Sequence, residues 1–437
     1  MRTLMNDWLS TISIVDGPAF VLSFVLTGAL LILLGITRQG VRARVRHFRR
    51  LVLAAAIAGA VVGAVLTWLL SDVINVFGVS LTWVVRIADT LAFAGFAVAL
   101  VNVVTTRWWR ALIALVTAAL TAWCLFLTIN VDFGQYPTLG DAVGTTYRDT
   151  LALPEKPQNA LSITEWTAPD DLPEEGLVGT VDIAARAADF APRPAAVYLP
   201  PAALTASAPE LPVVIALSGQ PGTPSDVFSA GGVDQMMDSI AQANGGLAPI
   251  VVVPDQLGDP SINPMCVDGA LGDSQTYLVE DVRAWITEHF AVRAEPSGWT
   301  IAGFSQGGTC AIQLGAAYPE IFGSIIDVSG EEAPTLGSHQ RTIDEGFGGD
   351  AKAYEAATPL HLLAENEPFT DSTAIFVAGE NDAQYSAYMD TVSAAAERAD
   401  MTTIRAVSPG TGHDWNTARY GFSLAFDALL TNWGLTR

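Results

Sequence analysis

The sequence has few charged residues for its length, few cysteines and no pattern of metal ligands. Only 15% of its 437 residues are charged and 50% are apolar, a composition that leans toward membrane proteins. The 5 histidines and 3 cysteines do not fall into the spacings of structural zinc sites. No internal repeat is visible. These absences argue against a zinc protein and a repeat protein, and we expect neither a metal nor another cofactor.

Basic residues are scarce after residue 130. Residues 1–130 contain 10 basic and 4 acidic residues, a net charge of +6, whereas the remainder contains 12 basic and 41 acidic residues, a net charge of −29. Such an acidic segment is soluble and repels the phosphates of nucleic acids and other anionic surfaces. We therefore expect the two parts to occupy different environments, and we expect no nucleic-acid partner.

Four long apolar runs occupy the first part, at 18–36, 51–70, 81–104 and 111–129. Each is close to the ~20 residues that cross a bilayer as a helix. We predict a four-helix transmembrane domain over residues 1–130; a buried soluble core, the alternative, would have no polar faces to show to water. Arg2 is the only basic residue before the first run, and no A-x-A cleavage site follows the run. We therefore expect no cleaved signal peptide.

Arginines cluster in two of the three loops between these runs. Six lie between the first and second runs, two lie between the third and fourth, and residues 71–80 contain none. The positive-inside rule places both basic loops in the cytoplasm, and both termini with everything after residue 130 outside. Arg86 and Asp89 interrupt the third run. We expect them to form an interfacial ion pair, although a functional charge is the alternative.

Short apolar runs alternate with helical patterns in the acidic part. Residues 131–176 are polar, and we interpret them as a juxtamembrane segment and linker. Over 177–437 the helical patterns separate strands expected at 178–184, 195–199, 213–217, 250–253, 300–302, 325–328, 374–378 and 403–407. The later alternation predicts a mostly parallel sheet with helices on both faces. Active sites of such sheets lie at the carboxyl ends of the strands.

The most informative motif is a Gly-Phe-Ser-Gln-Gly pentapeptide at residues 303–307. It follows an apolar stretch and precedes an alanine-rich helical pattern, which is the strand–turn–helix context of a nucleophile elbow. The two glycines leave room for a strained turn that presents the Ser305 hydroxyl to a base. The alternative is an ordinary serine in a glycine-rich turn. We predict that Ser305 is a catalytic nucleophile.

Asp382 and His413 follow Ser305 in the chain order of the α/β-hydrolase triad. Asp382 lies just beyond the 374–378 strand, and His413 lies in a glycine-rich loop before the last helical pattern. A serine hydroxyl is a weak nucleophile until a base removes its proton. We expect His413 to be that base and Asp382 to fix its tautomer. Glu380 is an alternative acid.

Two backbone N–H groups are expected to form the oxyanion hole, those of Gln306 and Gln220. Gln306 follows the nucleophile, and Gln220 lies in the loop after the 213–217 strand, where Pro221 has no N–H to donate. A long segment, 331–371, separates the sixth and seventh strands. Segments of this length are usually functional, and we expect this one to cover the acyl part of a substrate.

The three cysteines are divided between the two parts. Cys124 lies in the fourth apolar run, where we expect a small apolar filler. Cys266 follows the fourth expected strand, and Cys310 lies on the helix after Ser305. A disulfide can persist outside the cytoplasm. A Cys266–Cys310 bridge is therefore our hypothesis, with two free thiols as the alternative.

From about residue 179 to its end the chain resembles the putative-esterase branch of the α/β-hydrolases, which includes esterase D-like enzymes and mycolyltransferases. The resemblance rests on GFSQGG at 303–308, on Gly379 with Asp382, on GHDW at 412–415 and, more loosely, on VYLP at 197–200 and SGQ at 218–220. It implies acyl transfer to water or to a sugar hydroxyl through Ser305, Asp382 and His413.

Four spans before such a domain resemble the membrane-anchored esterases of actinobacteria. The mycolyltransferases are secreted without a membrane bundle, and their nucleophile turn lacks the glycine found here as Gly307. The choice between hydrolase and transferase therefore stays open.

We expect an extracytoplasmic serine esterase or acyltransferase that acts on acyl esters or glycolipids of the cell envelope, next to membrane lipid. The alternatives are a serine peptidase and a non-catalytic assembly or lipid-handling protein with a hydrolase-like binding domain.

Overall fold

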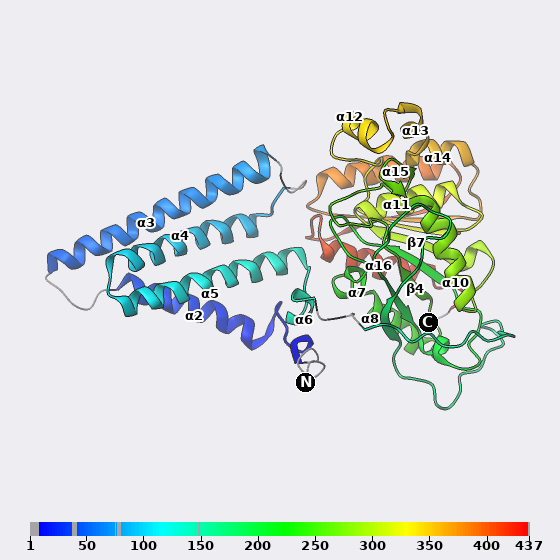
Figure 1. Cartoon of the computed structure of the whole chain (residues 1–437), viewed down its shortest axis with the longest axis horizontal. Helices are drawn as coiled ribbons and strands as arrows, with labels where there is room; N and C mark the ends of the chain where they lie inside the picture. Colours follow the sequence, from blue (N-terminus) through cyan, green and yellow to red (C-terminus); the bar gives the residue numbers. More distant parts are fainter. Residues whose placement is uncertain are drawn as a thin grey trace. The chain divides into compact units, whose positions relative to one another are not determined.

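The computed structural model describes residues 8–36, 42–74, 76, 80–144, 146 and 149–435. The chain forms two compact units, Met1–Thr145 and Thr146–Arg437, and each is described by itself (Figure 1). Arg38 of the first basic loop and part of the 71–80 loop lie outside the described residues.

Four long helices form the first unit, α2 (Gly17–Gly35), α3 (Arg42–Trp68), α4 (Trp83–Thr105) and α5 (Trp108–Phe133). In the described part of the chain, these four helical segments are long and apolar enough to cross a membrane. α4 packs between α3 and α5 (Figure 1). A Cβ added at Gly59 of α3 would lie 2.4 Å from the Phe93 carbonyl oxygen of α4, so the two backbones approach closely, as small residues allow between membrane helices.

Arg86 and Asp89 have other partners than the ones expected. The Arg86 guanidinium binds both carboxylate oxygens of Asp72, at 2.6 and 2.7 Å, on a π-helical turn, η1 (Leu69–Val73), that continues α3. Asp89 instead accepts a hydrogen bond from Thr67. Side chains on a helix point toward its N-terminus, so Arg86 reaches back past the start of α4 and away from Asp89.

A sheet of eight strands forms the centre of the second unit, in the order β1-β2-β4-β3-β7-β8-β9-β10. Six neighbouring strands, β4, β3, β7, β8, β9 and β10, are parallel to one another, whereas β2 is antiparallel to both β1 and β4. This is the mostly parallel sheet that the sequence predicts. The strands are β1 (Leu177–Val181), β2 (Ala195–Leu199), β3 (Val213–Leu217), β4 (Ile250–Val253), β7 (Trp299–Phe304), β8 (Ser324–Val328), β9 (Thr373–Gly379) and β10 (Thr402–Ser408).

Helices cover both faces of this sheet, because alternate residues of each buried strand face opposite cores. Val213, Ile215 and Leu217 of β3 join one core, while Val214 and Ala216 join the other. The first core is covered by α10 (Arg283–His289), α11 (Gln306–Ala317) and α15 (Ala383–Arg398), and the second by α7 (Asp226–Ser229), α8 (Val233–Ala243) and α16 (Trp415–Leu429).

The expected linker, 131–176, divides between the two units. The short helix α6 (Leu139–Ala142) belongs to the first unit. Leu151 and Trp166 are buried in the first core of the second unit, and the Leu151 N–H donates to the Thr180 carbonyl of β1. A few apolar anchors in a polar segment are enough to fix it on the domain surface, so the second unit starts well before the first strand.

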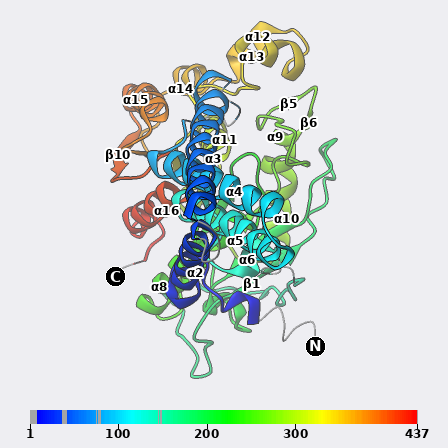
Figure 2. The same cartoon turned by 90° about the vertical axis from the view of Figure 1, so that its left-hand side faces the viewer.

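The long connection between β8 and β9 is helical. It contains α12 (His339–Arg341), the π-helical turn η5 (Thr342–Gly346), α13 (Ala351–Ala356) and α14 (Pro359–Asn366). α12 and α13 lie side by side at one end of the second unit (Figures 1 and 2). A short hairpin, β5 (Asp268–Gly269) and β6 (Gly272–Asp273), contacts this connection. Ala270, in the turn of the hairpin, donates its N–H to the Gly346 carbonyl. That the segment 331–371 covers the acyl part of a substrate stays a prediction.

Candidate active site

Ser305 forms the whole turn between β7 and α11. Its φ of 58° and ψ of −123° lie in a strained region of backbone conformation. A Cβ added at Gly303 would lie 2.0 Å from the Gly307 carbonyl oxygen, and one at Gly307 would lie 2.4 Å from the Leu217 carbonyl oxygen. Both positions therefore require glycine, because backbone atoms occupy the space of a side chain. This is the geometry of a nucleophile elbow.

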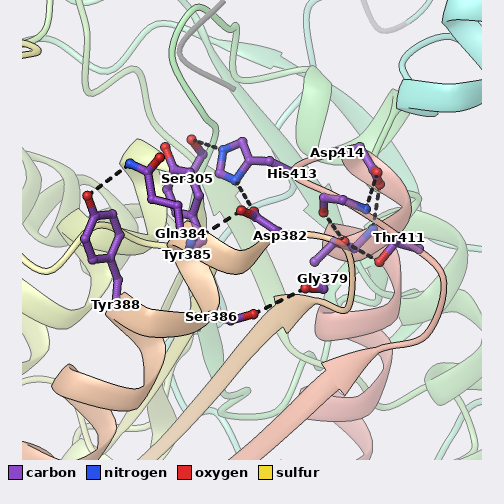
Figure 3. Close-up of polar contacts among 12 residues, drawn as sticks. Ser305, Gly379, Asp382, Gln384, Tyr385, Ser386, Tyr388, Thr411, His413 and Asp414 are labelled. Atoms are coloured by element: carbon purple, nitrogen blue, oxygen red, sulfur yellow. Dashed lines mark hydrogen bonds and ion pairs between the residues drawn. The ribbon is translucent and has the colours of Figure 1, made fainter. Parts of the chain in front are cut away.

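Ser305, His413 and Asp382 meet at the carboxyl ends of the strands (Figure 3). His413 Nε2 lies 2.8 Å from Ser305 Oγ, and His413 Nδ1 lies 3.2 Å from Asp382 Oδ2. Asp382 follows β9 and caps α15 by accepting from the Tyr385 N–H, while His413 follows β10. The three side chains are thus aligned as nucleophile, base and orienting carboxylate.

Glu380, the alternative acid, has a different partner. Its carboxylate accepts a hydrogen bond from the Gly410 N–H at 2.7 Å. Gly410 begins the turn that leads to His413, so this hydrogen bond stabilises that turn. The contact to the imidazole is made by Asp382 instead.

Two groups near the imidazole, Tyr385 and Glu331, were missed by sequence reasoning. The ring of Tyr385 stacks on His413, with 3.8 Å between centroids. Its hydroxyl lies near the carboxyl group of Glu331. Thr309 donates its hydroxyl hydrogen to the same carboxyl group and accepts from the Glu331 N–H at 2.9 Å. Glu331 follows β8, so its place at the carboxyl end of a strand was the signal that could have found it.

Burial raises the pKa of Glu331 above its ordinary value, although the Thr309 hydrogen bond and the neighbouring His413 oppose this shift. Burial also raises the pKa of Asp327, on β8, to about 7. Asp327 accepts from the Gly330 N–H at 2.8 Å, which holds the turn that carries Glu331. Burial therefore shifts both carboxyl groups toward their neutral forms relative to exposed carboxyl groups.

The loop that carries Gln220 lies against the nucleophile. A Cβ added at Gly219 would lie 3.3 Å from the Cβ of Ser305. Gln306 is the first residue of α11, and the first N–H groups of a helix have no acceptor within it. Its side chain is buried and points into the protein, where its amide nitrogen donates to Asn263. Both expected oxyanion donors thus belong to segments that border Ser305.

Cys266 and Cys310 are joined by a disulfide bond. It connects the loop after β4 to the second turn of α11, the helix that begins at the nucleophile turn. Both residues are fully buried. Cys124 is a free thiol buried in α5, where its sulfur lies 3.3 Å from the Thr27 hydroxyl.

Comparisons with known proteins identify the family to which the second unit belongs. A family model described as putative esterase matches residues 191–420. An uncharacterised protein of Corynebacterium glutamicum is 32% identical over 444 residues, which cover 99% of this chain and 100% of that protein. An S-formylglutathione hydrolase from Agrobacterium tumefaciens has the same fold, with a TM-score of 0.51 and 19% identity over 60% of this chain and 97% of that enzyme. The chain therefore belongs to the putative esterase family, as a carboxylic ester hydrolase whose α/β domain follows four apolar helices.

Proposed function

We propose that this esterase works outside the cytoplasmic membrane and carries the acyl group on Ser305, with His413 and Asp382 as its base and orienting acid. The observation that carries the proposal is the 2.8 Å contact between Ser305 Oγ and His413 Nε2, with Asp382 on the other ring nitrogen. A serine hydroxyl in this arrangement can be deprotonated as it attacks a carbonyl carbon.

The reaction proceeds through two matching half-reactions. His413 takes the Ser305 proton while the oxygen attacks the ester carbon, and the carbonyl oxygen becomes an oxyanion facing the N–H groups of Gln306 and Gln220. The protonated imidazole then gives its proton to the departing alcohol, which leaves an acyl-enzyme. Water, or a carbohydrate hydroxyl, attacks this ester with His413 again as the base and restores Ser305.

Several observations support an envelope substrate. The basic loops predict that the α/β unit follows the last span on the outer side, and the net charge of −29 over residues 131–437 suits an aqueous compartment. Tethering by four apolar helices keeps such an enzyme next to membrane lipid. An acyl ester or a glycolipid of the cell envelope is the substrate that fits this place.

Replacement of Ser305 tests the nucleophile, and Ser329 offers a matched control. Ser329 is also a buried serine with positive φ that follows a parallel strand, β8. We expect Ser305→Ala to abolish hydrolysis of a p-nitrophenyl ester and labelling by a fluorophosphonate, while Ser329→Ala keeps both. Retained turnover in a folded Ser305→Ala protein would exclude this nucleophile, and a wild-type protein that does not react would favour a binding scaffold.

Cysteine labelling tests the orientation. In a Cys124→Ala background, Glu397→Cys on the exposed side of α15 should react with a membrane-impermeant maleimide in intact cells. Arg46→Cys, in the basic loop that is predicted to be cytoplasmic, should react only after permeabilisation. The reverse pattern would place the esterase unit in the cytoplasm.

Lipid analysis tests the substrate class. Envelope lipids of a strain that lacks the protein should accumulate the uncleaved acyl ester, and the strain that carries Ser305→Ala should show the same change. A product in which the acyl group has moved to a carbohydrate would indicate transfer, whereas free acid would indicate hydrolysis. Unchanged lipids in both strains would contradict an envelope ester as substrate.

A further inference from the structure

The loop that carries Gln220 is held at one end by Gln256 and at the other by Arg193, which is bound to Asp255. At the first end, the Gln256 side-chain nitrogen donates to the Ser218 carbonyl at 2.6 Å. At the other end, the Arg193 guanidinium donates to the Gly222 carbonyl at 2.9 Å. Arg193 is itself held by Asp255. The Asp255–Gln256 dipeptide therefore reaches the whole loop through one direct contact and one ion pair.

The same Gln256 nitrogen also binds the nucleophile turn. It donates to the Gln306 side-chain oxygen at 3.0 Å, and Gln306 in turn donates to Asn263 at 3.0 Å. A primary amide has two N–H groups, and here one is directed to each of the segments that carry an oxyanion donor. No carboxylate could replace it in this role, because an ionised carboxylate only accepts hydrogen bonds.

The ion pair between Arg193 and Asp255 is held by several hydrogen bonds. Arg193 binds Asp255 through Nε and Nη2, at 2.9 and 2.7 Å, and the Arg193 backbone N–H adds a third bond to the same carboxylate. Asp255 and Gln256 have 0% exposure. Bidentate pairs fix geometry as well as charge, and buried polar groups that lose a partner are costly. The loop is thus constrained by contacts that tolerate little displacement.

We propose that Arg193, Asp255 and Gln256 form a loop clamp that sets the distance between the two oxyanion N–H groups, those of Gln220 and Gln306. The clamp rests on the proposed function of Ser305. Its members are positioning residues, since they act through the loop and the turn and not on the substrate. An oxyanion hole requires donors about 2.7–3.1 Å from the developing charge, so small displacements of either segment weaken it.

The clamp makes a backbone oxyanion hole accessible to mutagenesis. Loss of one donor costs about 10²–10³-fold in kcat. A displaced donor should cost less, so we expect Gln256→Met to lower kcat by about 10- to 100-fold, with KM changed by less than about threefold because the ground-state carbonyl gains little from the hole. The rate of phosphonylation of Ser305 by a fluorophosphonate should fall in parallel, since that reaction builds charge on the same oxygen.

Gln313 provides the matched control. It lies on α11 and is buried, as Gln256 is in the loop after β4. Its side-chain nitrogen donates to the Ala357 carbonyl at 3.1 Å and to the Met265 carbonyl at 3.4 Å, neither of which belongs to the Gln220 loop or the nucleophile turn. Gln313→Met should lower the unfolding temperature by a similar amount while kcat and the phosphonylation rate stay within about threefold of wild type. Equal losses of kcat in the two variants would show that the Gln256 effect is merely structural and would overturn the clamp.

Arg193→Lys tests the other arm and covers the case in which Gln256→Met does not fold. Lysine keeps the charge but loses the fork that reaches Asp255 and Gly222 together, so kcat should fall with little change in KM. The full membrane protein in detergent is used throughout. Wild-type protein that labels at Ser305 but tolerates both Gln256→Met and Arg193→Lys without loss of kcat would refute the clamp alone. Wild-type protein without such labelling would refute the proposed function instead.

Discussion

The imidazole of His413 is stacked on the phenol ring of Tyr385, with 3.8 Å between ring centroids and 27° between ring planes. Tyr385 is itself buried, with its hydroxyl near the carboxyl group of Glu331. The base of the triad is therefore held in two directions, by Asp382 at its edge and by Tyr385 at its face. Together these two contacts orient the imidazole toward Ser305.

Truncation of Tyr385 should impair this alignment. Aromatic pairs contribute about 0.5–1.5 kcal/mol beyond burial, so Tyr385→Leu should lower kcat by up to about tenfold. Tyr385→Phe keeps the ring and loses only the hydroxyl near Glu331, and we expect it to retain most of the activity. Steady-state kinetics of both variants test this, with Tyr420→Leu on the exposed side of α16 as control. Equal losses in the Leu and Phe variants would assign the effect to the hydroxyl group.

Asp327 should make stability depend on pH. Its pKa is raised by burial from 3.8 to about 7, so between these values the folded protein holds a proton that the unfolded chain has released. The contribution of this group is full below the unfolded pKa, falls by about 1.4 kcal/mol per pH unit as pH rises toward 7, and is constant above it. Asp327→Asn keeps an accepting oxygen for the Gly330 N–H but cannot titrate.

Unfolding temperatures of wild type and Asp327→Asn, measured at pH 5 and pH 8, check this expectation. The variant should gain relative to wild type as pH increases. A difference between the two proteins that is the same at both pH values would show that Asp327 does not bind the proton in the folded state.

Removal of the disulfide should destabilise the esterase unit. The Cys266–Cys310 bridge closes a loop of sequence separation 44, and such cross-links typically contribute about 2–4 kcal/mol. We expect the double variant Cys266→Ala, Cys310→Ala to unfold at a lower temperature, whereas Cys124→Ala changes it little. Mass spectrometry of unreduced peptides checks the bond itself, and two free thiols in the native protein would disprove it.

Gly307→Ala should damage the nucleophile turn. The added Cβ would lie 2.4 Å from the Leu217 carbonyl oxygen and 2.5 Å from that of Ser218, and neither backbone atom can move without shifting β3. Overpacking of this kind costs about 1–3 kcal/mol, and a displaced Ser305 should lose at least about tenfold in kcat. Gly28→Ala, where the added carbon meets nothing within 4 Å, serves as control. Wild-type activity in Gly307→Ala would show that the turn accommodates the methyl group.

Much of the architecture was predictable because it depends on local patterns. The apolar runs of the first unit are each close to the length of a membrane span, and short runs with turns between them marked the strands of the sheet. The order of Ser305, Asp382 and His413, with one residue after each of three parallel strands, placed all three at the same edge. Such features depend on periodicity and chain order, which a sequence displays directly.

What the sequence by itself determined was therefore the class of fold, the spans and the candidate triad. Only the tertiary structure decided the partner of Arg86, the burial of Trp166 in a polar segment, the stacking of Tyr385 on the base, and the contacts of Gln256 with both oxyanion segments. Each of these joins residues far apart in the chain through side-chain directions and packing. No local pattern encodes such contacts, because they form only when the surrounding elements are already in place.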